Sequence, residues 1–163
     1  SLSEIGQLLW AAQGITSDRG FRTAPSAGAL YPLELYLVVG DVEQLSPSVY
    51  KYQHDMHRLI NIAQGDLRDE LQAASLDQSA IGDAPAVIVI AAVYERTTVK
   101  YGDRGNRYVH MEVGSAAQNV YLQAVSLDLG TVFIGAFHDQ NINSLLHMQE
   151  DEHPLAIMPV GRK

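Results

Sequence analysis

Two segments far apart in the sequence carry side chains whose types and spacing could support chemistry. The first, residues 100–108, reads Lys-Tyr-Gly-Asp-Arg-Gly-Asn-Arg-Tyr and holds three cations and two tyrosines. Lys100 and Tyr101 are candidate proton-transfer groups if burial or a neighbouring charge lowers their pKa values. We therefore take this pair as the candidate catalytic residues.

The other two cations of the segment have two possible roles. Arg104 and Arg107 could bind an acidic group, or they could pair with Asp103 and Glu112. A solvated basic loop accounts for the same residue types, so the functional and the structural interpretations both stay open at this point.

The second segment, residues 23–32, is a loop of small and apolar residues where a surface loop should be polar. Pro25 and Pro32 fix φ, Gly28 permits a backbone conformation that other residues avoid, and Ser26 supplies a hydroxyl. Such a loop can lie with its backbone against a flat, mostly apolar ligand. A buried crossover packed under a helix is the alternative.

A third segment, residues 130–137, reads Gly-Thr-Val-Phe-Ile-Gly-Ala-Phe and predicts a strand bracketed by glycines. It lacks the Lys-Ser/Thr that follows the glycines of a phosphate-binding P-loop. Gly135 and Ala136 leave backbone N–H groups bare, so the edge of a ring could dock there. A tight strand end would need the same small residues.

Composition excludes several classes of function. The chain has 163 residues, of which 47% are hydrophobic and 18% charged, and this predicts one globular domain over residues 1–163. The formal net charge of −8 argues against nucleic acid or an anionic membrane surface as a partner. Because there is no cysteine, any redox chemistry must belong to a bound cofactor. The six histidines are dispersed and predict no metal site. We expect a cytoplasmic protein, since we find neither a signal peptide nor a membrane span.

The elements that position these segments mix helices and strands without regular alternation. The continuous apolar run 86–93 predicts a central strand buried on both faces. The longest helix, 107–129, is apolar most of the way round, which points to a core shared between subunits. This mixture favours an α+β fold. The remaining expected elements are helices at 4–13, 66–75 and 139–148, strands at 33–39 and 155–161, and a hairpin of strands at 49–52 and 58–62.

Together these segments resemble the nitroreductase-like flavoproteins, and more narrowly the SagB-type thiazoline/oxazoline dehydrogenases. The matching runs occur in order and span nearly the whole chain. They are residues 25–34, 100–104, 107–108, 112–114, 117–119, 129–131, 134–137 and 159–161.

The resemblance implies a mostly antiparallel central sheet flanked by helices, a long buried helix, and an intertwined obligate homodimer with FMN at two sites across the interface. Lys100 and Tyr101 match a Lys-Tyr pair associated with base chemistry. The residues that the resemblance places around the flavin are Pro25, Ser26, Ala27, Gly28 and Leu30 against the isoalloxazine, Ile134, Gly135 and Ala136 at its N5 edge from the other subunit, and Arg162 and Lys163 at the phosphate.

One departure from the family pattern concerns the phosphate. Members of the family open with an Arg-x-Ser-type segment that grips the FMN phosphate, and this chain begins at Ser1, after the expected place of that segment. We expect either that the segment has been removed or that the protein is a short variant that binds the FMN phosphate more weakly.

The activity implied by the resemblance is FMN-dependent oxidation of peptide azolines to azoles. A base, Lys100 or Tyr101, would remove a proton while a hydride passes to FMN. A generic nitroreductase or quinone reductase, with NAD(P)H as electron donor, is the enzymatic alternative. A non-catalytic scaffold subunit of a biosynthetic complex is the alternative of another class.

Overall fold

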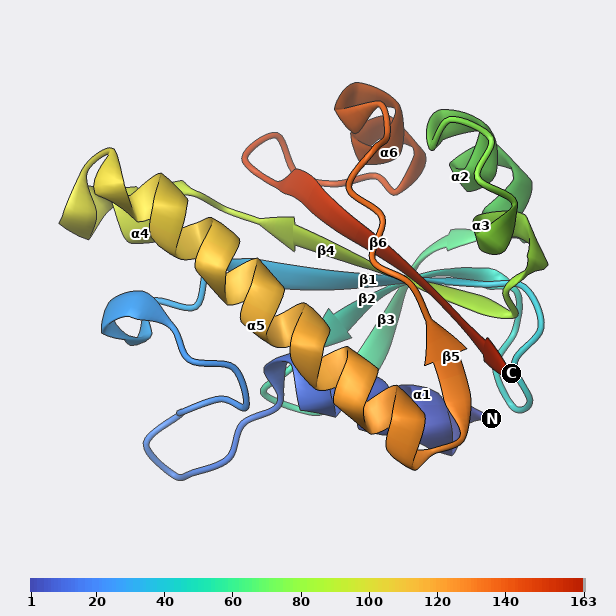
Figure 1. The fold of residues 1–163 in the computed structure, drawn as a ribbon, viewed down its shortest axis with the longest axis horizontal. Helices are drawn as coiled ribbons and strands as arrows, with labels where there is room; N and C mark the ends of the chain where they lie inside the picture. The colour runs from blue at the N-terminus through green and yellow to red at the C-terminus, as the bar shows by residue number, and fades with distance from the viewer. Residues whose placement is uncertain (163) are drawn as a thin grey trace.

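The computed structural model describes residues 1–162, and its sheet is antiparallel throughout (Figure 1). The six strands lie in the order β3-β2-β1-β4-β6-β5. This confirms the predicted α+β fold with an antiparallel sheet flanked by helices. In chain order the elements are α1 (Leu2–Gln13), the 3-10 turn η1 (Ala27–Ala29), β1 (Leu33–Val39), β2 (Ser48–Gln53), β3 (Arg58–Gln64), α2 (Arg68–Ala74), α3 (Ser79–Asp83), β4 (Ala86–Ala92), α4 (Glu95–Tyr101), α5 (Arg104–Ser126), β5 (Leu129–Thr131), α6 (Asp139–Leu145) and β6 (His153–Arg162).

The central strand is β4, as the apolar run predicted. All seven of its residues are buried, and it pairs with β1 on one side and β6 on the other. Because side chains of a strand alternate between faces, Ile88 and Ile90 point to one core and Val87 and Val89 to the other. A strand buried in this way requires helices on both faces of the sheet.

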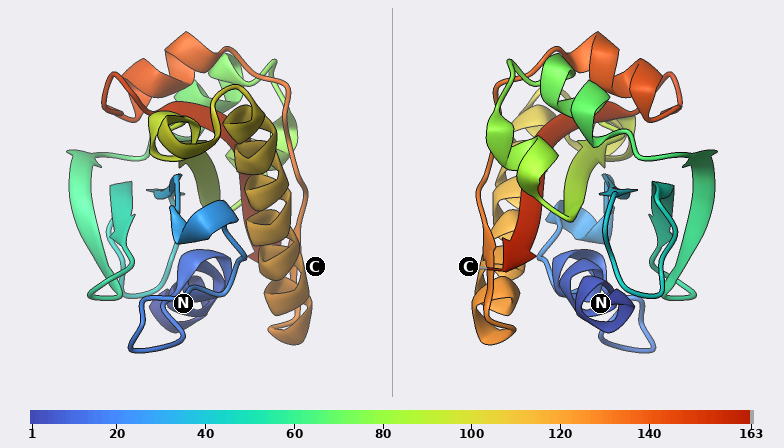
Figure 2. Two further views of the ribbon diagram at one scale, coloured as in Figure 1. Left: turned by 90° about the vertical axis from the view of Figure 1, so that its left-hand side faces the viewer. Right: turned by 90° about the vertical axis from the view of Figure 1, so that its right-hand side faces the viewer.

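Two helical layers meet this requirement (Figure 2). On one face α1 and α5 pack on each other and on the sheet, with Leu8, Leu9, Val113 and Val120 in the core. The shorter helices α2, α3 and α6 cover the other face, where they bury side chains such as Leu71, Ile81 and Ile142. The long helix α5 therefore lies where one side faces the core and the other faces outward.

The segment after α5 differs from the prediction of a strand over 130–137. Only Leu129–Thr131 pairs as β5, and the chain then continues as coil with one isolated bridge, Ile134 to Ile157. Val132 and Phe133 are exposed, and the Phe133 N–H donates to the Tyr121 hydroxyl (2.7 Å) instead of to a strand. A side chain of α5 thus takes the place of strand pairing at Phe133.

Helix α4 was not predicted, because residues 95–101 were expected to lead into a loop. Helix α4 packs against the start of α5 at Gly105, where an added β carbon would lie 2.9 Å from the Thr98 Cα. The two helices therefore approach closely at a point where only glycine has room. Within residues 1–162 no helix has the length and apolar character needed to cross a membrane.

A buried carboxylate links β1, β2 and β6. The Glu152 side chain is 2% exposed and accepts hydrogen bonds from the Tyr36 hydroxyl, the Lys51 ammonium and the Gln149 N–H. Burial by itself raises the pKa of this carboxyl, but the three donors outweigh burial and hold the pKa below its ordinary value. The ionised form is therefore the one that the folded protein favours.

We predict that Glu152→Gln lowers the free energy of unfolding at pH 7 by about 2 kcal/mol, because Lys51 loses the closer of its two carboxylate partners and keeps only Glu34, at 3.4 Å. Since the folded pKa is depressed, the stabilisation by Glu152 is present above the unfolded value near 4.5 and is lost as the pH falls through the folded pKa. Urea unfolding at pH 7 and at pH 4 measures both effects. The exposed Glu150→Gln is the control, and equal stability of the two variants would contradict this account.

Candidate functional site

The 25–32 loop joins α1 to β1 through an unusual backbone. Gly28, Ala29 and Tyr31 all have positive φ, at 63°, 53° and 48°. Side-chain-bearing residues rarely adopt this region, and where they do the surrounding structure must hold them. Pro25, Gly28 and Ala29 are exposed. The loop is therefore a strained platform at the surface of this chain, and the alternative of a buried crossover is wrong.

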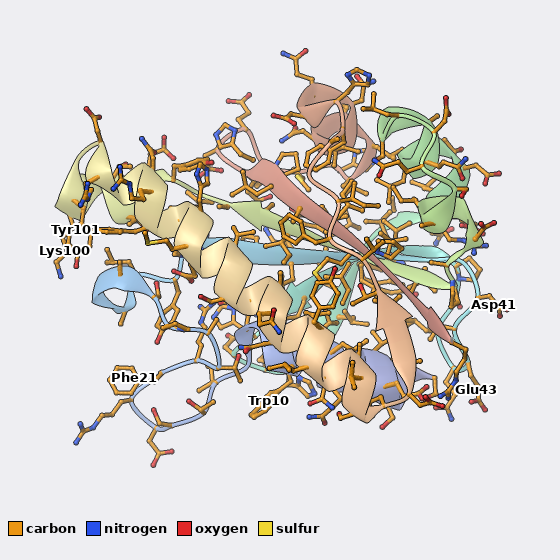
Figure 3. The ribbon with its side chains drawn as sticks, in the orientation of Figure 1. Trp10, Phe21, Asp41, Glu43, Lys100 and Tyr101 are labelled. Atoms are coloured by element: carbon orange, nitrogen blue, oxygen red, sulfur yellow. The ribbon has the colours of Figure 1, made fainter. Side chains whose placement is uncertain are left out.

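The Lys100–Tyr101 pair lies directly against this loop. A β carbon added to Gly28 would lie 2.8 Å from the Tyr101 hydroxyl oxygen and 2.9 Å from the Lys100 Nζ. Lys100 Nζ is 5.4 Å from the centre of the Tyr101 ring, whose edge contacts Tyr108. Figure 3 shows both side chains at the end of the molecule where α4 meets the η1 loop. Two segments that are far apart in the sequence thus form one surface.

The remaining cations of this region divide into two groups. Arg104 and Arg107 are exposed, and neither forms an ion pair with any residue of the 1–162 range. The pairing with Asp103 or Glu112 considered from the sequence is absent, because Glu112 faces the core. Arg96, in contrast, pairs with Glu34 (2.6 Å) and donates to the Tyr31 carbonyl (3.3 Å), which fixes the end of the loop.

A half-buried arginine holds the base of the loop. Arg22 donates to Gln13 Oε1 (2.8 Å) and lies 2.7 Å from His54 Nε2. Its guanidinium stacks over the Tyr31 ring, and its backbone N–H donates to the Tyr31 hydroxyl (3.1 Å). The Tyr31 N–H in turn donates to Ser26 Oγ (2.9 Å). These contacts join α1, the loop and the β2–β3 turn.

Glu112 lies beneath this loop, on the inward face of α5. Its side chain is buried, with 3% of its surface exposed, and burial raises its pKa to about 7. The Ser26 hydroxyl, the Arg22 charge and the Gln13 amide oppose burial and lower the pKa, but by less. Glu112 is thus the buried acid closest to the loop, and it titrates near neutral pH.

Hydrogen bonds at both of its ends hold the 134–136 segment at the surface. Ile134 is buried and exchanges two backbone hydrogen bonds of 2.9 Å with Ile157. The Ala136 carbonyl accepts from the Gln78 amide (3.0 Å). Gly135 and Ala136 themselves are exposed, so their backbone is accessible to a ligand.

A single chain does not bring the predicted flavin contacts together. Figures 1 and 2 show the η1 loop and the segment between β5 and α6 on opposite sides of α5. Leu30 lies in the loop and is half-exposed. Arg162 ends β6 and pairs with Glu4 (2.7 Å), and Lys163 lies outside the described residues.

Sequence reasoning missed the polar residues under the loop. Gln13 was read only as the end of a helix, and Arg22 was not singled out. Glu112 did carry a signal, because it falls at helical spacing among Val109, Val113 and Ala116 on the apolar face of α5. A lone carboxyl in such a stripe predicts a buried polar contact.

Comparison with known proteins assigns the chain to a family. The model of the nitroreductase family matches residues 1–162. The nitroreductase homologue MJ1384 of Methanocaldococcus jannaschii is 54% identical over the whole chain, which covers 81% of that protein. A nitroreductase homologue from Anabaena variabilis is 32% identical with a TM-score of 0.90, over 97% of this chain and 34% of its own.

More distant relatives are named as processing proteins. McbC, the microcin B17-processing protein of Escherichia coli, is 28% identical over 86% of this chain and 54% of its own length. A chain of the E. coli microcin synthetase McbBCD complex, solved with truncated pro-MccB17 bound, superposes with a TM-score of 0.85 at 26% identity, over 99% of this chain and 64% of its own. The chain thus spans little more than half of McbC and a third of the Anabaena protein.

We predict that Tyr121→Phe loosens the segment that carries Gly135 and Ala136. The Phe133 N–H loses its acceptor, a loss of about 1 kcal/mol, so its amide exchange should accelerate about five-fold. Amide exchange followed by NMR measures this rate. Tyr50→Phe, which removes a hydroxyl bonded to Ser46, is the control. An unchanged Phe133 rate would show that the tyrosine does not fix the segment.

Proposed function

The chain belongs to the nitroreductase family of oxidoreductases, which typically depend on FMN, and we propose that it binds FMN and oxidises peptide azolines to azoles. The observation that carries the proposal is the contact of the Gly28 loop with Lys100 and Tyr101. It puts two groups capable of proton transfer at the edge of a surface suited to a flat ring.

The residues present fit a flavin. The loop offers Pro25 and Gly28 as an exposed face of small side chains, and its conformation is fixed by Arg22, Arg96 and Ser26 before any ligand binds. Such preorganisation lowers the entropy lost on binding. In the 134–136 segment, the exposed backbone at Gly135 and Ala136 suits hydrogen bonds to the polar edge of the ring. We assign Arg162 and Lys163 to the phosphate, which requires Arg162 to leave Glu4.

The reaction removes two hydrogens from the azoline ring. One leaves a ring carbon as a proton to Lys100 or Tyr101, and the other leaves with two electrons as a hydride. The bound flavin supplies the hydride acceptor, and oxygen or another oxidant restores it. This chain contributes the base, holds the substrate ring near it, and excludes water with the apolar loop.

A homodimer completes the site in this proposal. The outward face of α5 carries Met111, Leu122 and Val125, which are 59%, 63% and 63% exposed and lie on one side of the helix. Val132 and Phe133 extend this apolar surface towards Gly135. Large apolar side chains exposed on one helix face favour a partner that covers them. A second copy packed on it would supply the second flavin contact that a single chain leaves on the far side of α5.

A second candidate is an NAD(P)H-dependent nitroreductase or quinone reductase. Lys100, Arg104 and Arg107 are exposed at the end of α4 and the start of α5, and the two arginines have no carboxylate partner within residues 1–162. Such cations suit the phosphates of a dinucleotide. Rapid anaerobic bleaching of the flavin by NADPH, followed by reduction of a nitroaromatic, would favour this candidate over azoline oxidation.

We predict that the protein given FMN shows a bound-flavin absorbance band at about 450 nm. Lys100→Ala and Tyr101→Phe should keep that spectrum but slow oxidation of a thiazoline peptide by about 10²–10⁴-fold, because they remove the candidate base. Absorbance and product mass spectrometry measure the two properties. Tyr50→Phe is the control.

The two readouts separate the parts of the proposal. Failure to bind saturating FMN would reject the flavin assignment and leave a scaffold role. Full azoline oxidation by both variants would reject the base assignment alone.

A further inference from the structure

A contact between two basic side chains ties the base of the 25–32 loop to the β2–β3 turn. Arg22 Nη2 lies 2.7 Å from His54 Nε2, and both side chains are half-buried. An arginine guanidinium stays charged in proteins and has only donors. His54 Nε2 must therefore be the acceptor, which requires a neutral imidazole with its hydrogen on Nδ1. Protonation of His54 would remove the acceptor and place two cations at hydrogen-bond distance.

Arg22 is the residue through which His54 reaches the loop. Its guanidinium carbon lies 4.5 Å from the centre of the Tyr31 ring, and its backbone N–H donates to the Tyr31 hydroxyl (3.1 Å). Tyr31 has a positive φ, and its own N–H donates to Ser26 Oγ (2.9 Å). A residue with a side chain keeps a positive φ only where its surroundings hold it. The position of the Arg22 guanidinium therefore bears on the conformation of the loop.

The turn that carries His54 is held by the sheet. Strands β2 and β3 pair as far as Gln53 and Arg58, so His54 begins a turn of residues 54–57 that the two strands close. The Arg58 side chain also donates to Gln53 Oε1 (2.5 Å) at the base of this turn. Because the sheet fixes the backbone on this side of the contact, a repelled Arg22 is the partner that must move.

We infer that His54 is a positioning residue: as the neutral acceptor for Arg22 it holds Tyr31 and the 25–32 loop in place, and its protonation releases them. The effect on flavin binding rests on the proposed function, but the effect on the loop does not. His54 lies on a different element from Lys100 and Tyr101 and acts on the candidate site only through Arg22.

The charges around His54 favour its neutral form. Burial lowers the pKa of His54, and the positive charges of Arg22 and Arg96 lower it further. Asp55 in the same turn and Glu34 on β1 act in the opposite direction. Since the folded pKa lies below the ordinary value of 6.5, the stabilisation by neutral His54 is present above pH 6.5 and is lost as the pH falls through the folded pKa.

The first test needs no flavin. Imidazole nitrogen chemical shifts at pH 8 should show His54 with its hydrogen on Nδ1 and none on Nε2. The protection of the Arg22 and Tyr31 amides against exchange, corrected for intrinsic rates, should fall about ten-fold between pH 8 and pH 5. The amides of β4 should keep their protection. A hydrogen on Nε2 at pH 8, or loop protection that is equal at the two pH values, would overturn the inference.

Two variants separate His54 from the other titrating groups. His54→Gln offers an amide oxygen as acceptor at every pH, so loop protection should stay at the wild-type pH 8 value down to pH 5. His54→Leu offers no acceptor and should give the low value throughout. Glu112, which has a pKa of about 7 and interacts with Arg22, is present in both variants. A His54→Gln protein that keeps the wild-type pH dependence would assign the titration to another group and overturn the inference.

The matched control is His57→Gln. His57 lies in the same turn, but its Nδ1 contacts the Tyr52 hydroxyl (2.8 Å) and not Arg22. This variant should therefore keep the wild-type pH dependence of loop protection. Loss of that dependence in His57→Gln would show that His54 is not the group responsible.

The second test is the dissociation constant of FMN. The ratio of the wild-type Kd to the His54→Gln Kd should be near one at pH 8 and rise to about five at pH 5. Taking the ratio cancels the titration of the FMN phosphate itself. A ratio of one at both pH values, in a protein whose loop responds to pH, would uphold the inference for the loop and reject its contact with the flavin. A loop response in a protein that never binds FMN would uphold the inference and reject the proposed function.

Discussion

Burial of β4 on both faces is the constraint on which the rest of the structure depends. Every side chain from Ala86 to Ala92 is withdrawn from water, so the chain must place helices over both faces of the sheet. On one face this places α5 across the sheet, with α1 packed beside it. The ends of these two helices then determine where the candidate site forms: α5 starts beside Lys100 and Tyr101, and α1 ends at Gln13.

The candidate site combines an apolar surface with a layer of polar contacts beneath it. The surface consists of small, exposed residues such as Gly28 and Ala29, and the positive φ of Ala29 and Tyr31 costs free energy. Underneath, the contacts of Arg22 with Tyr31 and of Ser26 Oγ with the Tyr31 N–H offset this cost. A flat ring needs the first feature, and a fixed orientation of that ring needs the second. The two parts are close in space because α5 and the loop share the same side of the sheet.

Much of this fold follows from the sequence. The strand at 33–39 was predicted to the residue, and the central strand to within one residue, since continuous apolar runs report burial directly. The strand over 130–137 was wrong because a tyrosine on α5, Tyr121, takes the Phe133 N–H, a contact between elements that no local pattern encodes. The same limit applies to the site. The unusual backbone conformation of the 25–32 loop could be predicted from Gly28 and the two prolines. The polar residues Gln13, Arg22 and Glu112 come together only through tertiary packing, so the sequence did not predict that they lie under the loop.

The central claim is that one flavin site needs both the 25–32 loop and the Gly135–Ala136 backbone, each from a different copy of the chain. Gly28→Val damages the first contact and Ala136→Trp the second. Co-expression of the two variants with different tags, followed by tandem purification, isolates heterodimers with one intact and one doubly damaged site. We predict that each parent variant binds no FMN and that the heterodimer binds one FMN per dimer. Absence of FMN from a stable heterodimer, when the wild-type dimer binds two, would place the site within a single chain and contradict the account.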